Sequence, residues 1–251
     1  MRNCEKCGRK KWIKPLSGDT TTIVDGQRVR LWKCANPLCP HTQAEESPFI
    51  PQHPLRKLYF DIEFGYSKFL AFDRKVPSKF LPIENMIEEG HVLCWASAWL
   101  DGADEFQYIE SMCVTQEESL RNDDRRILEG LWERLDAAHY WTGHNSDAYD
   151  TKMVHYRFHK HGMGFPLAAK QVDSLKLAKQ YMRSPSNGLD FFTNDGKQEM
   201  TREDWKKIAL TGDPDTLLKM ETYCRHDVRI GADWFRGLVH DIEMSGRSVW
   251  K

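Results

Sequence analysis

Hydrophobic and polar positions from about residue 55 onward alternate between the patterns of strands and of helices. Residues 55–62 are apolar and rich in strand-favouring residues, and residues 92–100 form a continuous apolar run typical of a buried strand. Residues 105–109 favour a third strand. The pattern therefore predicts three strands in the first part of this region.

Helical spacing dominates the chain after these strands. Within residues 116–138 the apolar positions recur at helical intervals: Ile127, Leu128, Leu131 and Leu135. A short run at 139–143 favours a further strand, which leads into a helical segment from about Asp150, and the second half is mostly helical. Early strands followed by alternating strands and helices predict an α/β or α+β sheet with covering helices.

The first 46 residues have a different pattern, which is organised around cysteines. Four of the seven cysteines form Cys-x2-Cys and Cys-x4-Cys pairs separated by 26 residues: Cys4, Cys7, Cys34 and Cys39. Between the pairs, two β-rich runs flank Asp25-Gly26, which predicts a hairpin. Two cysteine-bearing turns at the end of a hairpin are typical of a zinc ribbon, and so small a unit would depend on its metal for stability. Unliganded thiols, or His41 in place of one cysteine, are the alternatives.

A proline-rich connector follows the cysteines, with Pro48, Pro51 and Pro54 close together. The sequence predicts a zinc ribbon over 1–46, a linker over 47–57 and a second domain over 58–251.

Composition and charge support two units with different roles. The chain is 40% hydrophobic and 29% charged, as in globular proteins. Residues 1–57 carry 11 basic and 5 acidic side chains, a net charge of +6, whereas the remainder carries 25 basic and 32 acidic side chains, a net charge of −7. A basic unit can hold a polyanion and acidic clusters can hold cations, although a solvated charge pattern would look similar.

The longest apolar run, residues 92–100, is too short to cross a membrane, and the N-terminal residues lack an apolar signal segment. We therefore expect a cytoplasmic, reducing location, where paired cysteines bind metal more often than they form disulfides.

Two acids end the first strand of the second domain, in the motif Asp61-Ile62-Glu63. Residues i and i+2 of a strand point to the same side, so both carboxylates can reach one metal centre. Such crowding of like charge is unfavourable unless cations neutralise it. The alternative interpretation of this motif is a strand whose last residues are exposed to solvent and have no function.

Two further motifs place acids later in the chain. Asn145 precedes Asp150 at a strand-to-helix junction, and Tyr223 and Asp227 lie one turn apart on one face of a predicted helix. Taken in order, the three motifs resemble those of the DEDD (DnaQ-like) 3′–5′ exonucleases of the RNase H-like superfamily: Asp-x-Glu, Asn-x3-Phe-Asp and Tyr-x3-Asp, with Tyr149 here in place of Phe.

The resemblance covers about residues 56–240, and 172–190 resembles the proofreading domains of B-type polymerases. Because Tyr223 stands four residues before Asp227 and Thr222 occupies the position of the alternative His, the chain resembles the Tyr subtype, DEDDy. The resemblance implies an RNase H-like mixed sheet flanked by helices, preceded by the small β-hairpin zinc ribbon.

The same resemblance implies a site for two Mg²⁺ or Mn²⁺ ions. Asp61 would bridge both ions, Glu63 and Asp227 would hold the ion that activates water, and Asp150 would support the other. Tyr223 would orient the attacking water, since its usual pKa of ~10 argues against an anionic base.

Substrate contacts are expected from Asn145, which would place the terminal nucleotide, and from Phe64 and Tyr66, which could stack on bases. Other polar residues favour structural roles: Asp173 as a helix cap rather than a ligand, and Asp147, His226, Lys206 and Lys207 as ordinary surface or structural groups.

The sequence thus predicts a zinc ribbon fused to an exonuclease that removes nucleotides from 3′ ends of single-stranded DNA. An RNA exonuclease and a non-catalytic nucleic-acid-binding adaptor on the same fold are the alternatives. The ribbon would tether nucleic acid or dock a replication or repair protein, and no membrane partner is expected.

Overall fold

The computed structural model describes residues 56–71, 81–100, 109–166, 170–193 and 199–250 in full, together with the backbone of four strands within 13–46. The chain divides into two compact units, and the main boundary falls between Pro54 and Leu55.

The first unit contains a four-stranded antiparallel sheet. Its strands are β1 (Ile13–Pro15), β2 (Thr21–Val24), β3 (Gln27–Cys34) and β4 (Thr42–Glu46). Val24 pairs with Gln27, so the predicted hairpin between β2 and β3 is confirmed. Of the four predicted zinc ligands, Cys4, Cys7 and Cys39 lie outside the described residues, and Cys34 is described only by its backbone in β3. The zinc site therefore stays a prediction.

The second unit is built on a five-stranded mixed sheet with the order β11-β10-β5-β8-β9. The strands are β5 (Lys57–Phe64), β8 (Val92–Trp99), β9 (Glu110–Cys113), β10 (Tyr140–Gly143) and β11 (Lys170–Asp173). β8 is antiparallel to both β5 and β9, whereas β10 is parallel to both β5 and β11. This sheet and its flanking helices are compatible with the predicted RNase H-like fold.

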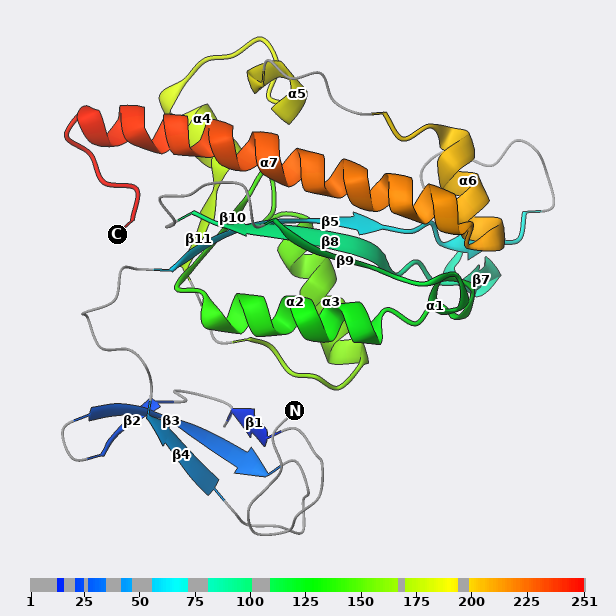
Figure 1. Cartoon of the computed structure of the whole chain (residues 1–251), viewed down its shortest axis with the longest axis horizontal. Helices are drawn as coiled ribbons and strands as arrows, with labels where there is room; N and C mark the ends of the chain where they lie inside the picture. The colour runs from blue at the N-terminus through cyan, green and yellow to red at the C-terminus, as the bar shows by residue number, and fades with distance from the viewer. Residues whose placement is uncertain are drawn as a thin grey trace. The chain divides into compact units, whose positions relative to one another are not determined.

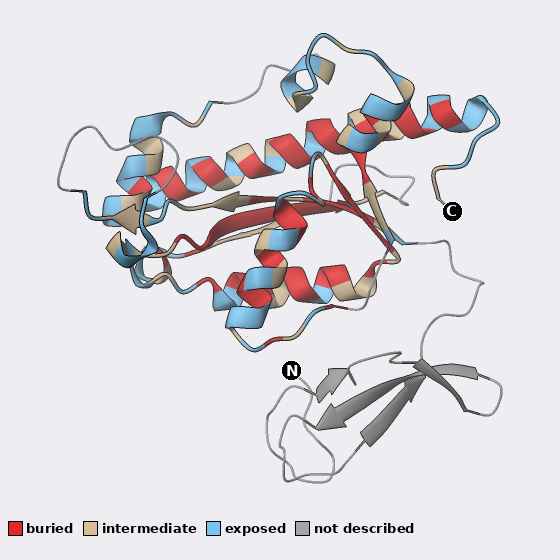
Figure 2. Ribbon diagram, turned by 180° about the vertical axis from the view of Figure 1, so that it is seen from behind, coloured by how far each residue is buried: buried red, intermediate tan, exposed pale blue. Residues whose placement is uncertain are grey.

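Helices cover both faces of the five-stranded sheet (Figure 1). The long helix α7 (Pro214–Met244) lies along one face, and α2 (Arg125–Ala137) and α3 (Asp150–Lys160) lie on the other. The core lies between these layers, where β8 is buried along nearly its whole length (Figure 2). At Gly231, α7 approaches β5 so closely that a Cβ there would stand 2.7 Å from the Tyr59 Cζ.

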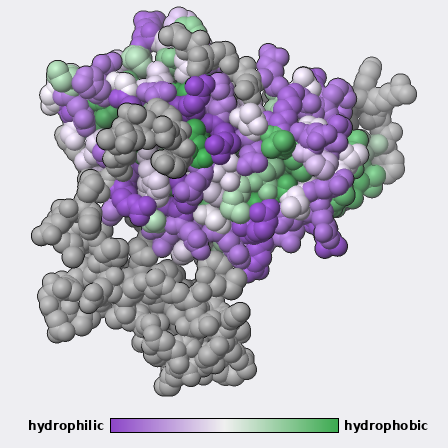
Figure 3. Space-filling model, in the orientation of Figure 1, coloured by the Kyte–Doolittle hydropathy of each residue, from purple (hydrophilic) through white to green (hydrophobic). Residues whose placement is uncertain are grey.

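Smaller elements complete the second unit. They are β6 (Lys68–Phe69), η1 (Ile83–Asn85), β7 (Met86–Glu88), α1 (Gln116–Arg121), α4 (Ser174–Tyr181), α5 (Leu189–Phe192) and α6 (Arg202–Thr211). Most of the coloured surface in Figure 3 is hydrophilic, with apolar side chains gathered towards its right-hand part. None of the helices in the described part of the chain is long and apolar enough to cross a membrane.

Two predicted elements differ from the structure. The single helix expected over 116–138 is two helices, because Asn122 adopts a left-handed conformation with φ of 51° and ends α1. The third strand was expected at 105–109, but β9 begins at Glu110; residues 105–108 are outside the described ranges.

Candidate active site

β5 presents Asp61 and Glu63 to α7. The two half-buried acids flank the buried Ile62, as strand alternation requires. Tyr59, two residues before Asp61, faces the same way, and its ring lies 6.2 Å from that of Phe235 on α7. Asp61 and Glu63 therefore emerge on the side of the sheet that α7 covers.

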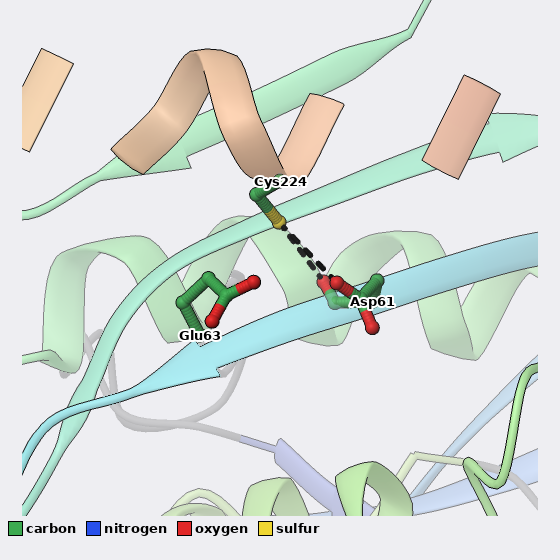
Figure 4. A group of neighbouring side chains, drawn as sticks. All are labelled: Asp61, Glu63 and Cys224. Carbon is green, nitrogen blue, oxygen red and sulfur yellow. Dashed lines mark hydrogen bonds between the residues drawn. The ribbon is translucent and has the colours of Figure 1, made fainter. Parts of the chain in front are cut away.

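α7 contributes three neighbouring side chains to this site. The Cys224 Sγ lies 3.7 Å from the Asp61 backbone oxygen and 3.9 Å from Asp61 Oδ2. Oxygen atoms of Asp61 and Glu63 and the Cys224 sulfur all lie within 4.8 Å of one another (Figure 4). The hydroxyl of Tyr223, the residue before Cys224, is hydrogen-bonded to the carboxylate of Asp227, which lies one turn further along α7. The first and third predicted motifs thus meet across the β5–α7 interface.

Asp150, the first residue of α3, brings the second motif to the same place. Strand β10, which precedes α3 in the chain, runs parallel to β5. Gly143 at the end of β10 lies so close to β5 that a Cβ would stand 2.7 Å from the Phe60 oxygen. The Asp150 carboxylate is buried and accepts a hydrogen bond from the backbone N–H of Ile62, between the two acids of β5. The connection after β10 therefore returns Asp150 to the strand that carries Asp61 and Glu63.

All four carboxylates raise the pKa of at least one of two tyrosines at the β5–α7 interface. Burial raises the pKa of Tyr59, and the carboxylates of Asp61, Asp150 and Asp227 raise it further. Burial likewise raises the pKa of Tyr223, with further contributions from Asp227, Glu63 and Asp61. All four predicted acids thus act on the two tyrosines that lie among them.

Burial also raises the pKa of Asp150 to about 7, although hydrogen bonds from backbone N–H groups oppose the shift. Negative charge is therefore costly at this carboxylate in the absence of a cation. Carboxylate oxygens are the ligands that Mg²⁺ and Mn²⁺ prefer, so this donor set fits such ions.

Asp173 is the N-cap of α4, as predicted, and accepts hydrogen bonds from the backbone N–H groups of Leu175 at 2.8 Å and Asn145 at 3.2 Å. It thereby fixes the turn in which Asn145 has a left-handed φ of 64° and an exposed side chain. Asn adopts this conformation more readily than most residues. Asp147 in the same turn is half-buried and forms an ion pair with Lys176.

The remaining predicted groups lie away from this convergence or have local partners. The half-buried Phe64 ring packs against Gly90, where a Cβ would stand 2.7 Å from Cε1. Tyr66 is exposed, with its ring 5.6 Å from that of Trp205. Their roles with substrate stay predictions. Local pairing of the other groups agrees with the expected structural roles: Lys206 with Glu203, Lys207 with Asp213, and His226 with Arg229.

Sequence reasoning missed two residues at the site, Tyr59 and Cys224, and named Tyr149 only as the residue that replaces Phe in the second motif. Tyr149 is 48% exposed, and its pKa is raised by burial and by the carboxylates of Asp150 and Glu63. Each of these three residues is one or two positions along the sequence from an acid or tyrosine of the motifs. Helical and strand periodicity could have placed Tyr59 with Asp61, but the approach of Cys224 to Asp61 requires the packing of α7 on β5.

Comparison with known proteins gives little further information. Neither a protein-family model nor a curated protein matches this chain. Among solved structures, the chain is similar to a family B DNA polymerase from the hyperthermophilic archaeon Pyrobaculum calidifontis, with 17% sequence identity and a TM-score of 0.49. The likeness covers 86% of this chain and 29% of the polymerase chain, so this chain spans less than a third of that protein's length. Similarity at this level assigns neither a family nor an activity.

Proposed function

We propose that this chain is a metal-dependent 3′–5′ exonuclease that hydrolyses phosphodiester bonds at 3′ ends of single-stranded DNA and releases nucleoside monophosphates. The observation that carries the proposal is the convergence of Asp61, Glu63, Asp150 and Asp227 around Tyr223, from β5, α3 and α7. A binding module has no use for four acids crowded beside buried groups, because their mutual repulsion weakens the fold.

Two Mg²⁺ or Mn²⁺ ions fit this donor set. When bound, a pair of such ions supplies a hydroxide nucleophile and stabilises the charge on the leaving oxygen. Asp61 would contact both ions, Glu63 and Asp227 would hold one, and Asp150 would hold the other. One structural Zn²⁺ in the first unit, held by Cys4, Cys7, Cys34 and Cys39, belongs to the same proposal.

Tyr223 acts in this proposal as a neutral hydroxyl. Burial and three nearby carboxylates raise its pKa, so the phenol keeps its proton at neutral pH. Its hydroxyl is hydrogen-bonded to Asp227, which fixes the direction of both groups. In this arrangement Tyr223 orients the attacking water, and it does not remove a proton from that water as an anion.

Asn145 is suited to contact the terminal nucleotide. Its side chain is exposed, while Asp173 holds its backbone in the turn just before Asp150. A fixed backbone with an accessible amide offers hydrogen bonds to a substrate with little loss of conformational freedom. In the same proposal Phe64 contacts the single strand, and the basic first unit tethers nucleic acid or docks a replication or repair protein.

The test is hydrolysis of matched single-stranded DNA and RNA in Mg²⁺ or Mn²⁺ by the full chain and by Asp61→Asn. Asp241→Asn is the matched control, because Asp241 is an exposed acid near the end of α7. We expect metal-dependent hydrolysis by the wild type and the control and none by Asp61→Asn, with all three proteins folded. Binding of DNA without hydrolysis would favour the adaptor, and hydrolysis of RNA alone would change the substrate.

A further inference from the structure

A row of three side chains crosses the sheet beneath the first half of α7. Glu63 on β5 pairs with Cys94 on β8, and Cys94 pairs with Cys113 on β9. The Cys94 Sγ lies 3.9 Å from the Met220 oxygen and the Cys113 Sγ lies 3.6 Å from the Leu217 oxygen, so both thiols face α7.

Cys224 meets this row from the helix. Burial raises the pKa of the Cys94 thiol, and the neighbouring thiols of Cys113 and Cys224 raise it further; Cys94 and Cys224 are buried. Cys224 also contacts Asp61, as Figure 4 shows. The carboxylate pair of β5 thus continues directly into a group of three thiols, of which Cys94 and Cys224 are buried and Cys113 is partly exposed.

Oxygen and sulfur ligands together suit a different ion from the one that suits carboxylates alone. Mg²⁺ takes oxygen ligands, whereas Zn²⁺ and Cd²⁺ bind thiolate sulfur and also accept carboxylate oxygen. Bonds of about 2.0–2.3 Å in a tetrahedral shell put neighbouring ligand atoms about 3.3–3.8 Å apart. The candidate atoms of Asp61, Glu63 and Cys224 lie within 4.8 Å of one another, so small side-chain rotations would bring them to three positions of such a shell, with water in the fourth.

We propose that Asp61, Glu63 and Cys224 form a binding site for a thiophilic divalent cation such as Zn²⁺ or Cd²⁺. Binding replaces the Cys224 S–H bond with a metal–sulfur bond and releases one proton to solvent. Because Asp61 and Glu63 are also ligands in the proposed exonuclease site, occupancy by such an ion excludes Mg²⁺ and inhibits hydrolysis. This inhibitory consequence rests on the proposed function, whereas the binding site does not.

The experiment is a Cd²⁺ titration of the full chain, followed by the ultraviolet charge-transfer band of cadmium–thiolate bonds. Cysteines of the first unit contribute to this band in every variant, so the readout is the difference between variants. We expect Cys224→Ser to bind one Cd²⁺ fewer per chain than the wild type. Cys113→Ser is the matched control, because it removes a thiol of the same row that does not contact Asp61, and we expect it to retain the wild-type count.

Asp61→Asn keeps Cys224 in place and tests the oxygen ligand separately, which guards against a folding defect in Cys224→Ser. We expect it to weaken the same Cd²⁺ site by at least tenfold. Equal Cd²⁺ counts and equal affinities in the wild type, Cys224→Ser and Asp61→Asn would overturn the proposed site.

Inhibition of hydrolysis is then measured in excess Mg²⁺. We expect Cd²⁺ or Zn²⁺ to inhibit hydrolysis by the Cys113→Ser control more strongly than hydrolysis by Cys224→Ser. A chain that shows the Cd²⁺ difference but no hydrolysis would retain this site and lose the proposed exonuclease function. A chain that hydrolyses DNA but shows no Cd²⁺ difference would lose this inference alone.

Discussion

Gly231→Ala tests whether the close packing of α7 on β5 is what assembles the site. A Cβ at Gly231 would overlap the Tyr59 hydroxyl and stand 2.7 Å from Cζ. The ring cannot easily move aside, because Tyr59 is fully buried, packs against Phe235 and is hydrogen-bonded to Ser174. The helix must therefore retreat from the strand, which also separates Asp227 from Asp61.

The magnitude follows from a comparison with Gly237→Ala on the same helix, where a Cβ would meet no atom within 4 Å. Both substitutions gain about 1 kcal/mol of helix propensity. Overpacking of a core costs about 1–3 kcal/mol, so we expect Gly231→Ala to be less stable than Gly237→Ala by that amount. For a unit of this size the difference corresponds to a Tm lower by about 2–12 °C.

Urea and thermal unfolding of the two variants measure this difference, and hydrolysis of single-stranded DNA measures its effect on the site. We expect the activity of Gly231→Ala to fall by about 100-fold, since a displacement of ~1 Å has that effect on positioned groups. Adding Tyr59→Phe removes the overlapping hydroxyl and should restore part of the stability. Equal stability and activity of Gly231→Ala and Gly237→Ala would refute the argument that this contact holds the acids together.

Three further predictions concern single groups. Tyr223→Phe should lower kcat by about 10- to 100-fold with little change in KM, as measured by steady-state hydrolysis; an unchanged kcat would remove Tyr223 from the reaction. Asp150 is buried with its folded-state pKa raised to about 7, above the unfolded value of ~3.9, so the folded state binds the proton more tightly. Without added divalent cation, the free energy of unfolding should therefore fall between about pH 4 and pH 7, and Asp150→Asn should remove most of that fall in urea titrations at each pH; an identical pH dependence would show that Asp150 titrates normally. Asp173→Ala should cost about 1–2 kcal/mol in urea unfolding because α4 loses its cap, and should weaken nucleotide binding through the loosened Asn145 turn. Wild-type stability in Asp173→Ala would contradict the capping role.

The sequence was sufficient to predict those elements whose cause is local. The apolar run at 92–100 predicted β8, and the alternation around Asp61 predicted that Asp61 and Glu63 share one side of β5. Helical spacing likewise put Tyr223 and Asp227 on one face of α7. These patterns work because burial of a strand or helix face selects side chains at a fixed period.

Features that depend on packing between distant segments were not predictable in the same way. The break between α1 and α2 at Asn122 interrupts an otherwise helical pattern, and Asp124 beyond it is buried in an ion pair with Arg157 of α3. The contact of Cys224 with Asp61 joins residues far apart in the chain, and no local period marks it. Only the motif resemblance, and not periodicity, suggested that Asp150 would join the other acids.

The polarity of degradation tests the central claim most directly. The same single-stranded DNA is labelled at its 5′ end in one reaction and at its 3′ end in the other, and both are incubated with the full chain and Mg²⁺. The account predicts a ladder of shortening products from the 5′-labelled strand and immediate release of labelled mononucleotide from the 3′-labelled strand. Labelled mononucleotide released first from the 5′ end, internal fragments, or two intact strands would contradict it.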